Sequence, residues 1–479
     1  MPVPQQMAFA DVNGELVMFN EAEALASLDE NEEETVSKKH PVKKKGKKEA
    51  DLSGIPVIKV EHYLTEEELQ KRFGKNGWKQ LPDEIYKRYR FVPAKVEVEE
   101  HHVGVYASKD GDSMTKAPHP VNLLRGSLVS PSLEAAVLNG KYINGVPFAR
   151  LEKEFSRYGL SISRQNMANW TIECAERYLA VFYDYLHRYI YQSLVIHADE
   201  TTVLVRKDGR DAGSKSFMWV YCTGEGEEKA VILYEYQKTR KADHPEKFLK
   251  DYEGVCVTDG YQAYHKLAKE KEGLIVAGCW AHARRRYEEA VKALPAKNRK
   301  SSLAWQALEQ INMIYHVDNT LKELTPEERK KRRQDSVKPL VEAYFAWVKE
   351  KKKDGRIAEK SKTGKGLSYS LNQEEYLKVF LENGNVPLDN NAAERAIRNF
   401  CIGRKNWVII DTIRGAQTSA TIYSIAETAK ANHLKPYEYF EYLLEEIPKH
   451  MDDKDLSFCE DLLPWSPNLP AKCRKTEKK

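Results

Sequence analysis

The sequence predicts a mixed α/β protein, and three observations support that fold class. Five short apolar runs of strand type lie between residues 193 and 279, and stretches with helical apolar spacing flank them on both sides. The 479 residues are 41% hydrophobic and 31% charged, which supplies a sizeable core and excludes wholesale disorder. At roughly 150 residues per domain, we expect about three structural units.

Charge, cysteine content and apolar run length exclude several classes of protein. The chain has 76 basic and 72 acidic residues, a net charge of +4, so only the local distribution of charge can indicate partners. It has no apolar run long enough for a membrane helix and no secretory signal at its start. The seven cysteines are scattered without a C-x-x-C pair, which argues against a disulfide framework or a closed zinc site. A reducing, cytoplasmic location is expected.

The first 131 residues divide into two parts. Residues 1–50 form a charged arm that we expect to be disordered, because an acidic block is followed by seven lysines between Lys38 and Lys48. The lysines fit either an arm that tracks DNA or a solvated linker neutralised by the acidic block. Residues 51–131 form a small segment in which 89–108 alternates well enough for one or two strands.

Residues 132–190 are expected to be helical. One helix ends at Gly159, and Ser161 or Ser163 can cap the next helix over 164–182. This order is that of a helix-turn-helix, in which the second helix enters the DNA major groove by its first residues. The polar candidates for that contact are Ser163, Arg164, Gln165 and Asn169. A plain helical hairpin fits the same pattern.

The strand-like runs form the centre of the predicted fold. They cover residues 193–199, 216–222, 230–236, 254–259 and 274–279, with a helix over 244–252 between the third and fourth. Three strands at hairpin spacing followed by helix-linked strands indicate an RNase H-like core with a mixed sheet.

Further boundaries follow from this core. We expect its first part over 191–280, a helical insertion over 281–385, its second part with C-terminal helices over 386–450, and a poorly ordered tail over 451–479. The insertion carries the basic runs Arg284–Arg286 and Arg329–Arg333, which suit phosphate contacts or simply solvated helix faces.

Two aspartates end predicted strands. Asp199 ends the first strand, and Asp259 ends the fourth, where Gly260 permits a tight turn. Open α/β sheets bind ligands at such strand ends. If the first and fourth strands are neighbours, the two carboxylates meet; otherwise each is simply a turn-forming aspartate.

A glutamate lies on a predicted helix after the insertion. Asp389 or Asn390 can cap that helix, and its polar face carries Asn390, Asn391, Glu394 and Arg398. One carboxylate and one arginine on a polar face suit a metal–phosphate site. A capped surface helix with a Glu–Arg pair is the alternative. Two aspartates and one glutamate are the hard oxygen ligands that two Mg²⁺ ions need for phosphodiester chemistry.

Several motifs together resemble the insertion sequence 66 family of transposases. They are HADET at 197–201, TDGYQAY at 258–264, GCWAHARRRY at 278–287, DNNAAERAIR at 389–398, GRKNW at 403–407 and IYSIAETAKANHLKPYEYF at 422–440. The resemblance implies a DDE transposase, a metal-dependent enzyme of DNA transposition and recombination that cuts and joins strands. It places the catalytic and metal-binding triad on Asp199, Asp259 and Glu394.

The resemblance also implies cofactors and partners. Two Mg²⁺ ions, with Mn²⁺ as a substitute, would lie on the triad, and the partners would be element ends and target DNA in the bacterial nucleoid. We expect a homo-oligomer on DNA, accompanied by small accessory proteins of the same element. The candidate contacts to the DNA backbone are Arg395, Arg398, Arg404 and Lys405. Trp407 fits base stacking or, more often for a tryptophan after a turn, the core. The histidines near the triad, His197 and His282, and Arg285 can approach it, but a structural role is favoured for both histidines.

Two departures from the family pattern affect the N-terminal part. Relatives commonly carry two C-x-x-C pairs before the helix-turn-helix, whereas no cysteine precedes Cys174 here, so no zinc is expected. Residues before Asp51 show no sustained heptads, so the coiled coil of many relatives is not expected. Two other functions stay open: an RNase H-like nuclease that does not join strands, and a catalytically inactive DNA-binding protein derived from a transposase.

Overall fold

The structure is a computed structural model that describes most of the chain. The described residues are 9–10, 16–17, 58–75, 79, 81–83, 85, 88, 94–109, 113–119 and 122–475 without 212, 225 and 356. Two compact units are present, one of residues 1–84 with 476–479 and one of residues 85–475. The lysine block expected to form a charged arm lies outside the described residues, as does most of the segment 1–50.

The first unit contains little regular structure within its described residues. Strands β1 (Phe9–Ala10) and β2 (Leu16–Val17) pair antiparallel. Helix α3 (Glu66–Phe73) begins at Thr65, whose hydroxyl accepts from the Glu68 amide while the Glu68 carboxylate accepts from the Thr65 amide. This reciprocal cap satisfies two backbone donors that the first turn of a helix leaves without partners.

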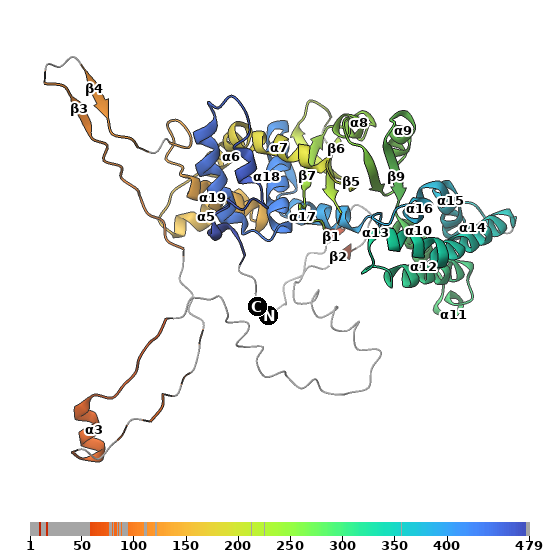
Figure 1. The fold of residues 1–479 in the computed structure, drawn as a ribbon, viewed down its shortest axis with the longest axis horizontal. Helices are drawn as coiled ribbons and strands as arrows, with labels where there is room; N and C mark the ends of the chain where they lie inside the picture. The colour runs from red at the N-terminus through yellow and green to blue at the C-terminus, as the bar shows by residue number, and fades with distance from the viewer. Residues whose placement is uncertain are drawn as a thin grey trace, which may run out of the picture. The chain divides into compact units, whose positions relative to one another are not determined.

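A mixed sheet is the centre of the second unit (Figure 1). Its strands are β5 (Val195–Lys207), β6 (Lys215–Thr223), β7 (Ile232–Gln237), β8 (Gly254–Thr258), β9 (Leu274–Gly278) and β10 (Ile409–Thr412). The strand order is β7-β6-β5-β8-β9, with β5, β6 and β7 antiparallel and β8 and β9 parallel to β5. The predicted mixed α/β fold class is confirmed.

Strand β5 is long, and two strands share one of its edges. Its other edge pairs with β6. On the shared edge, Val195–His197 pairs with β8 and Leu204–Lys207 pairs with β10, both parallel. Between these two pairings, side chains of helix α17 (Asn391–Trp407) and of its N-terminal flank bond to the β5 backbone. Sequence analysis did not predict β10.

Helices precede, interrupt and follow the sheet. Before it lie α4 (Pro131–Leu138), η1 (Asn139–Ile143), α5 (Phe148–Arg157), α6 (Arg164–Cys174), η2 (Ala175–Leu179) and α7 (Ala180–Ile190). Within it lie α8 (Asp243–Phe248) and α9 (Gln262–Glu270). After α17 lie α18 (Ile413–Ala431), α19 (Pro436–Glu446), η5 (Ile447–His450), α20 (Cys459–Leu462) and η6 (Ala471–Cys473). Among helices of the described part, none is long and apolar enough to cross a membrane.

A second group of helices follows β9. It consists of α10 (Trp280–Lys292), α11 (Ala296–Arg299), α12 (Leu303–Asn319), α13 (Pro326–Arg332), η3 (Arg333–Val337), α14 (Lys338–Lys353), α15 (Lys362–Asn372), α16 (Glu374–Lys378) and η4 (Val379–Leu381). Their apolar side chains form one cluster with Val255, Val257 and Ala277 of the sheet. The basic run of residues 329–333 is not simply a solvated face, because Arg333 is buried against Asp318 at 2.7 Å.

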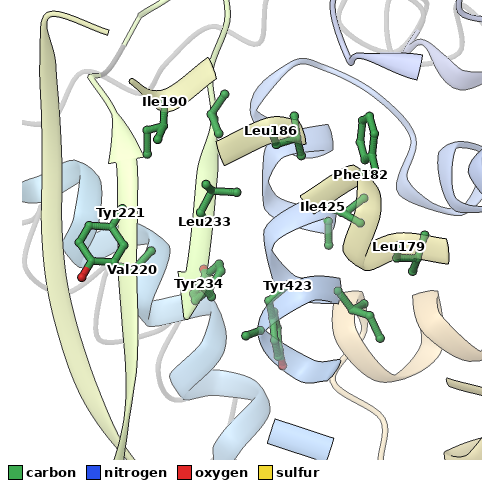
Figure 2. Close-up of a cluster of buried hydrophobic side chains, with 14 of the residues drawn as sticks. Leu179, Phe182, Leu186, Ile190, Val220, Tyr221, Leu233, Tyr234, Tyr423 and Ile425 are labelled. Carbon is green, nitrogen blue, oxygen red and sulfur yellow. The ribbon is translucent and has the colours of Figure 1, made fainter. Parts of the chain in front are cut away.

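Helix α17 covers one face of the sheet, and α18 lies along the outer edge of β7, where its Ser424 and Thr428 hydroxyls accept from the backbone amides of Tyr234 and Ile232. Figure 2 shows Phe182, Leu186 and Ile190 of α7 beside strand β7 and helix α18. Tyr234 of β7 donates its hydroxyl proton to the Ala396 carbonyl of α17 at 2.6 Å. The opposite face packs on α8, where Tyr221 stacks on Phe248 with ring centroids 3.6 Å apart. Asp199 lies across from Val220, so it shares the face that α17 covers.

The segment expected to resemble a helix-turn-helix contains α5 and α6. Helix α5 ends before Gly159, which has a φ of 82°, a backbone conformation that glycine adopts without strain. Ser163, rather than Ser161, caps α6, because its hydroxyl accepts from the Asn166 amide at 3.1 Å. Whether these helices bind DNA stays a prediction.

Of two expectations about local order, that of one or two strands within 89–108 was confirmed and that of a poorly ordered tail was wrong. Of residues 89–108, only β3 (Val105–Ala107) is a strand among those described, and its partner is β4 (Met114–Lys116). The tail after residue 451 is not poorly ordered as far as residue 475. Cys459, Leu462 and Leu469 are buried there, and Tyr439 donates to the Leu462 carbonyl at 2.7 Å. The apolar residues of this tail are too widely spaced to show a period, but they fill the space beside α7 and α19.

Candidate active site

Asp199 lies within β5, on the face of the sheet covered by α17, and not at the end of its strand as predicted, because β5 continues to Lys207 through its pairing with β6. The residue is half-buried, and its Oδ1 accepts a hydrogen bond from the Glu200 amide at 2.8 Å. Because side chains alternate along a strand, Glu200 points to the opposite face and is almost fully buried. There it forms an ion pair with Arg240, which also faces Asp259 at 4.0 Å.

Asp259 follows the last residue of β8. The register pairs His197 with Val257, and continuing it by two residues brings Asp199 level with Asp259. The Asp259 carboxylate accepts from the Tyr261 amide at 2.9 Å, and the backbone carbonyl of Asp259 accepts from the Tyr369 hydroxyl at 2.8 Å. The next residue, Gly260, has a φ of 92°, and a side chain there would meet Gln373. The turn that presents Asp259 therefore requires glycine.

Glu394 lies in the first turn of α17, opposite the start of α10. Its carboxylate accepts from Arg285 at 3.1 Å and lies 3.7 Å from Nδ1 of His282. The side chain is about one quarter exposed, at 27%. Both partners come from α10, so the position of Glu394 depends on how α10 and α17 meet.

Asn390 fixes the start of α17 against the sheet and α10. Asn390 is fully buried; its Nδ2 donates to the Ala198 carbonyl at 2.9 Å, and its Oδ1 lies 2.9 Å from Nδ1 of His197. Its backbone amide donates to Sγ of Cys279 at 3.2 Å. Asp389 takes the local capping role instead, accepting from the Asn391 amide at 3.2 Å. His197 thus has a structural partner, as expected.

Burial and like charges raise the pKa of two acids on β5, Asp199 and Glu200. Burial first, then the carboxylates of Glu200, Asp259 and Glu394, raise the pKa of Asp199 to about 8. Burial also raises the pKa of Glu200 to about 7, and Arg240 opposes that rise. The charged forms of both carboxyl groups on β5 are therefore disfavoured in the folded chain.

The three carboxylates of the triad do not form one tight cluster. Within the described part of the chain, a single set of three acidic, histidine or cysteine residues has all its donor atoms within 4.8 Å of one another. That set is Cys279, His282 and Glu394, and it includes neither aspartate. Burial lowers the pKa of His282, opposed by Asp259 and Glu394, so both carboxylates act on the same imidazole. Glu394 thus lies on the α10 side of the site.

The candidate DNA-contacting residues fall into three settings. Arg395, Arg398 and Lys405 are exposed along α17, and Arg164 and Gln165 are exposed at the start of α6. Arg404 is half-buried rather than exposed, because its guanidinium donates to the Thr202 carbonyl and, at 3.1 Å, to the Thr201 hydroxyl. It fills the gap in the shared edge of β5, and its role in DNA contact stays a prediction. Trp407 packs against Phe400 beside the core rather than standing out.

A cleft of about 1070 Å³ lies beside the site. It runs between the start of β5, helices α12 and α13, and the start of α17. The basic side chains of its lining include Lys322, Arg329 and Arg395.

Sequence analysis did not identify three parts of this site. They are the Glu200–Arg240 pair, the link made by Asn390, and the sulfur of Cys279. The available signal was that Glu200, Cys279 and Asn390 lie inside the motifs HADET, GCWAHARRRY and DNNAAERAIR, whereas Arg240 lies in none of them.

Comparison with known proteins identifies the family. The model described as Transposase IS66 family matches residues 126–418, more than half of the chain, and the IS66 C-terminal element matches 424–465. Uncharacterized protein y4qI of Sinorhizobium fredii is 28% identical over 391 residues, covering 79% of this chain and 70% of its own length. Uncharacterized protein y4hP of the same organism is 25% identical over 399 residues, covering 80% and 71%. This chain therefore belongs to the IS66 transposase family.

Proposed function

We propose that this chain is an active DDE transposase that cleaves and joins DNA strands with Asp199, Asp259 and Glu394 as its catalytic triad. The observation that carries the proposal is the parallel pairing of β5 with β8, which brings Asp199 level with Asp259. Family membership makes a transposase the leading function. The strand order β7-β6-β5-β8-β9, with three antiparallel and two parallel strands, supports an RNase H-like core.

The donor set fits divalent metal ions. Carboxylate oxygens are the ligands that Mg²⁺ and Mn²⁺ prefer, and burial, together with repulsion from neighbouring carboxylates, raises the pKa of Asp199 to about 8. A divalent cation relieves that repulsion. Two bound ions would activate the attacking water or 3′-hydroxyl and stabilise the leaving oxygen. Asp199, Asp259 and Glu394 would hold them.

Other side chains of this site hold the triad in place. Backbone amides orient Asp199 and Asp259, and Asn390 fixes the helix that carries Glu394. Arg240 keeps Glu200 paired on the opposite face of the sheet. These contacts are formed before substrate arrives, which lowers the entropy cost of assembling the reactive geometry.

DNA is the proposed partner. Arg395, Arg398 and Lys405 are exposed on the helix that carries Glu394, and the adjacent cleft has basic side chains. Arg164 and Gln165 start α6, the helix that would enter the major groove of an element end. We further propose that the chain acts in the nucleoid as a homo-oligomer on DNA, with accessory proteins of the same element.

The proposal is tested by a strand-transfer assay with the ends of the encoding element and Mg²⁺ or Mn²⁺. We expect joined products from the wild type and none from Asp259→Asn or Glu394→Gln, all three binding DNA alike. The matched control is Asp411→Asn, which should retain the joined products. Asp411 is an exposed aspartate of β10 whose carboxylate pairs with Lys207 of β5. Cleavage without joining would favour a nuclease. DNA binding without chemistry in any metal, with accessory proteins supplied, would favour the inactive binding protein.

A further inference from the structure

The second cluster of metal-ligating side chains at this site combines sulfur, nitrogen and oxygen. Cys279 precedes the first residue of α10, and His282 follows three positions later, so both side chains lie on one side of the helix start. Glu394 reaches them from the first turn of α17, and the three donor atoms lie within 4.8 Å of one another. None of the sequence-predicted triad ligands other than Glu394 takes part.

The geometry points to a site for a thiophilic divalent cation of the Zn²⁺ class. A thiolate, an imidazole and a carboxylate are all common zinc ligands, whereas Mg²⁺ avoids sulfur. Two nitrogen or oxygen ligands of a tetrahedral zinc ion lie about 3.4 Å apart, given bond lengths of about 2.0–2.1 Å. Nδ1 of His282 and Oε1 of Glu394 are already 3.7 Å apart. We propose that Cys279, His282 and Glu394 bind such a cation, with the fourth position open.

An unpartnered polar atom supports this site independently. Nδ1 of His282 is buried and has no hydrogen-bond partner, which is unusual for a polar atom inside a protein. It faces Glu394, so a cation between them would satisfy it. Cys279 is fully buried, and its sulfur already accepts the Asn390 amide. Binding exchanges the thiol proton for the metal ion, and the proton passes to solvent.

Arg285 is compatible with the bound cation. Its guanidinium donates to Oε2 of Glu394 at 3.1 Å and, at the longer distance of 3.4 Å, to Oε1, the oxygen nearest His282. One oxygen can therefore ligate the metal while the other keeps its arginine. This arrangement holds Glu394 on the α10 side, away from the two aspartates. If Glu394 also binds Mg²⁺ as a triad residue, Zn²⁺ and Mg²⁺ compete for it. This competition is the one consequence of the site that rests on the proposed function. The site also revises the expectation of a zinc-free chain, which was based on the N-terminal segment.

The test is titration of the full-length, metal-free protein with Co²⁺, followed by displacement with Zn²⁺. Co²⁺ bound by a thiolate gives a charge-transfer absorption band that carboxylate and imidazole sites lack. We expect one equivalent of Co²⁺ with this band in the wild type and no band in Cys279→Ala. His282→Gln should retain thiolate ligation but weaken binding by about 100-fold, the scale of losing part of a metal site.

The control is Cys401→Ser, which removes the one half-buried thiol among the described cysteines and should leave the band unchanged. A band that survives Cys279→Ala, or that disappears in Cys401→Ser, would overturn the site. Unchanged Co²⁺ affinity in His282→Gln would overturn it as well, even if Cys279→Ala does not fold. No DNA or strand-transfer readout enters this test, so its failure is distinguishable from failure of the proposed function.

Discussion

The two halves of the candidate triad are held by different kinds of structure. Asp199 lies in β5 and Asp259 directly follows the parallel neighbouring strand β8, so the pairing of these two strands sets their relation. Glu394 belongs to a helix, and side-chain contacts of Asn390, Arg285 and His282 set its relation to the sheet. Register is hard to change without unfolding the sheet, whereas helix contacts can shift. The comparison teaches that the aspartates form the fixed part of the site and Glu394 the adjustable part.

The largest expected effect is on the fixed part. Asp199→Asn should lower strand transfer by about 1000-fold or more, because it removes a metal ligand whose transition-state stabilisation is worth several kcal/mol. The same change should stabilise the metal-free fold at pH 8, by up to about 5 kcal/mol for a pKa that rises from 3.8 to about 8. A strand-transfer assay beside thermal unfolding at pH 5 and 8 measures both. Equal stability of variant and wild type at pH 8 would contradict the crowding of charge around Asp199.

The sign of this pH effect follows from the direction of the shift. The pKa of Asp199 rises from 3.8 to about 8 on folding, so the folded state holds the proton more tightly. Its stabilising contribution is complete below pH 3.8 and is lost as the pH rises through 8. Wild-type stability should therefore fall across this window, and the fall should be smaller in Asp199→Asn. Adding Mg²⁺ should reverse part of the wild-type loss at pH 8.

The next effect concerns the contact that places the adjustable part. Asn390→Ala removes the bonds to the Ala198 carbonyl and to His197, both buried, and should cost about 2–4 kcal/mol of stability. Strand transfer should fall by roughly 10- to 100-fold, because Glu394 loses the anchor of its helix. Urea unfolding and strand transfer at a temperature where the variant is folded check these values. The matched control is Asn391→Ala, the half-buried neighbour at the first helical position, which should change both by far less.

Asn390 also shows how far the sequence could predict this site. The strand positions and the meeting of Asp199 with Asp259 follow from local apolar patterns and one topological rule. The role of Asn390 cannot be predicted in this way. From the sequence alone, an asparagine before a helix is expected to cap that helix, whereas its bond to the Ala198 carbonyl forms only when the sheet has folded. The sequence does not predict strand β10 for a similar reason. Its four residues gain a strand to pair with only because β8 does not reach the end of β5. Distant partners of this kind leave no periodic signal.

A smaller effect separates charge crowding from burial alone. Glu134 is fully buried in α4, where burial raises its pKa to about 8 and the Thr171 hydroxyl bonds one carboxylate oxygen. Deprotonation of Glu134 should lower stability between pH 4.5 and 8, and Glu134→Gln should remove that loss, a gain of up to about 4 kcal/mol at pH 8. Unlike Asp199→Asn, it should leave the stabilisation by Mg²⁺ intact. Thermal unfolding with and without Mg²⁺ measures the contrast, and loss of the Mg²⁺ response in Glu134→Gln would contradict the metal assignment to Asp199.

The smallest effect tests whether Glu394 is adjustable at all. Arg285 is about half exposed, at 51%, so its ion pair with Glu394 is screened by water and should contribute less than about 0.5 kcal/mol to stability. Arg285→Ala should nevertheless change strand transfer by a few-fold, because the pair biases where the carboxylate lies. The matched control is Arg284→Ala on the same helix, whose partner is Glu288. If Glu394 were as rigid as the aspartates, the two variants would behave alike. A difference in strand transfer without a difference in unfolding would instead show that the α10 contact positions Glu394 without stabilising the fold.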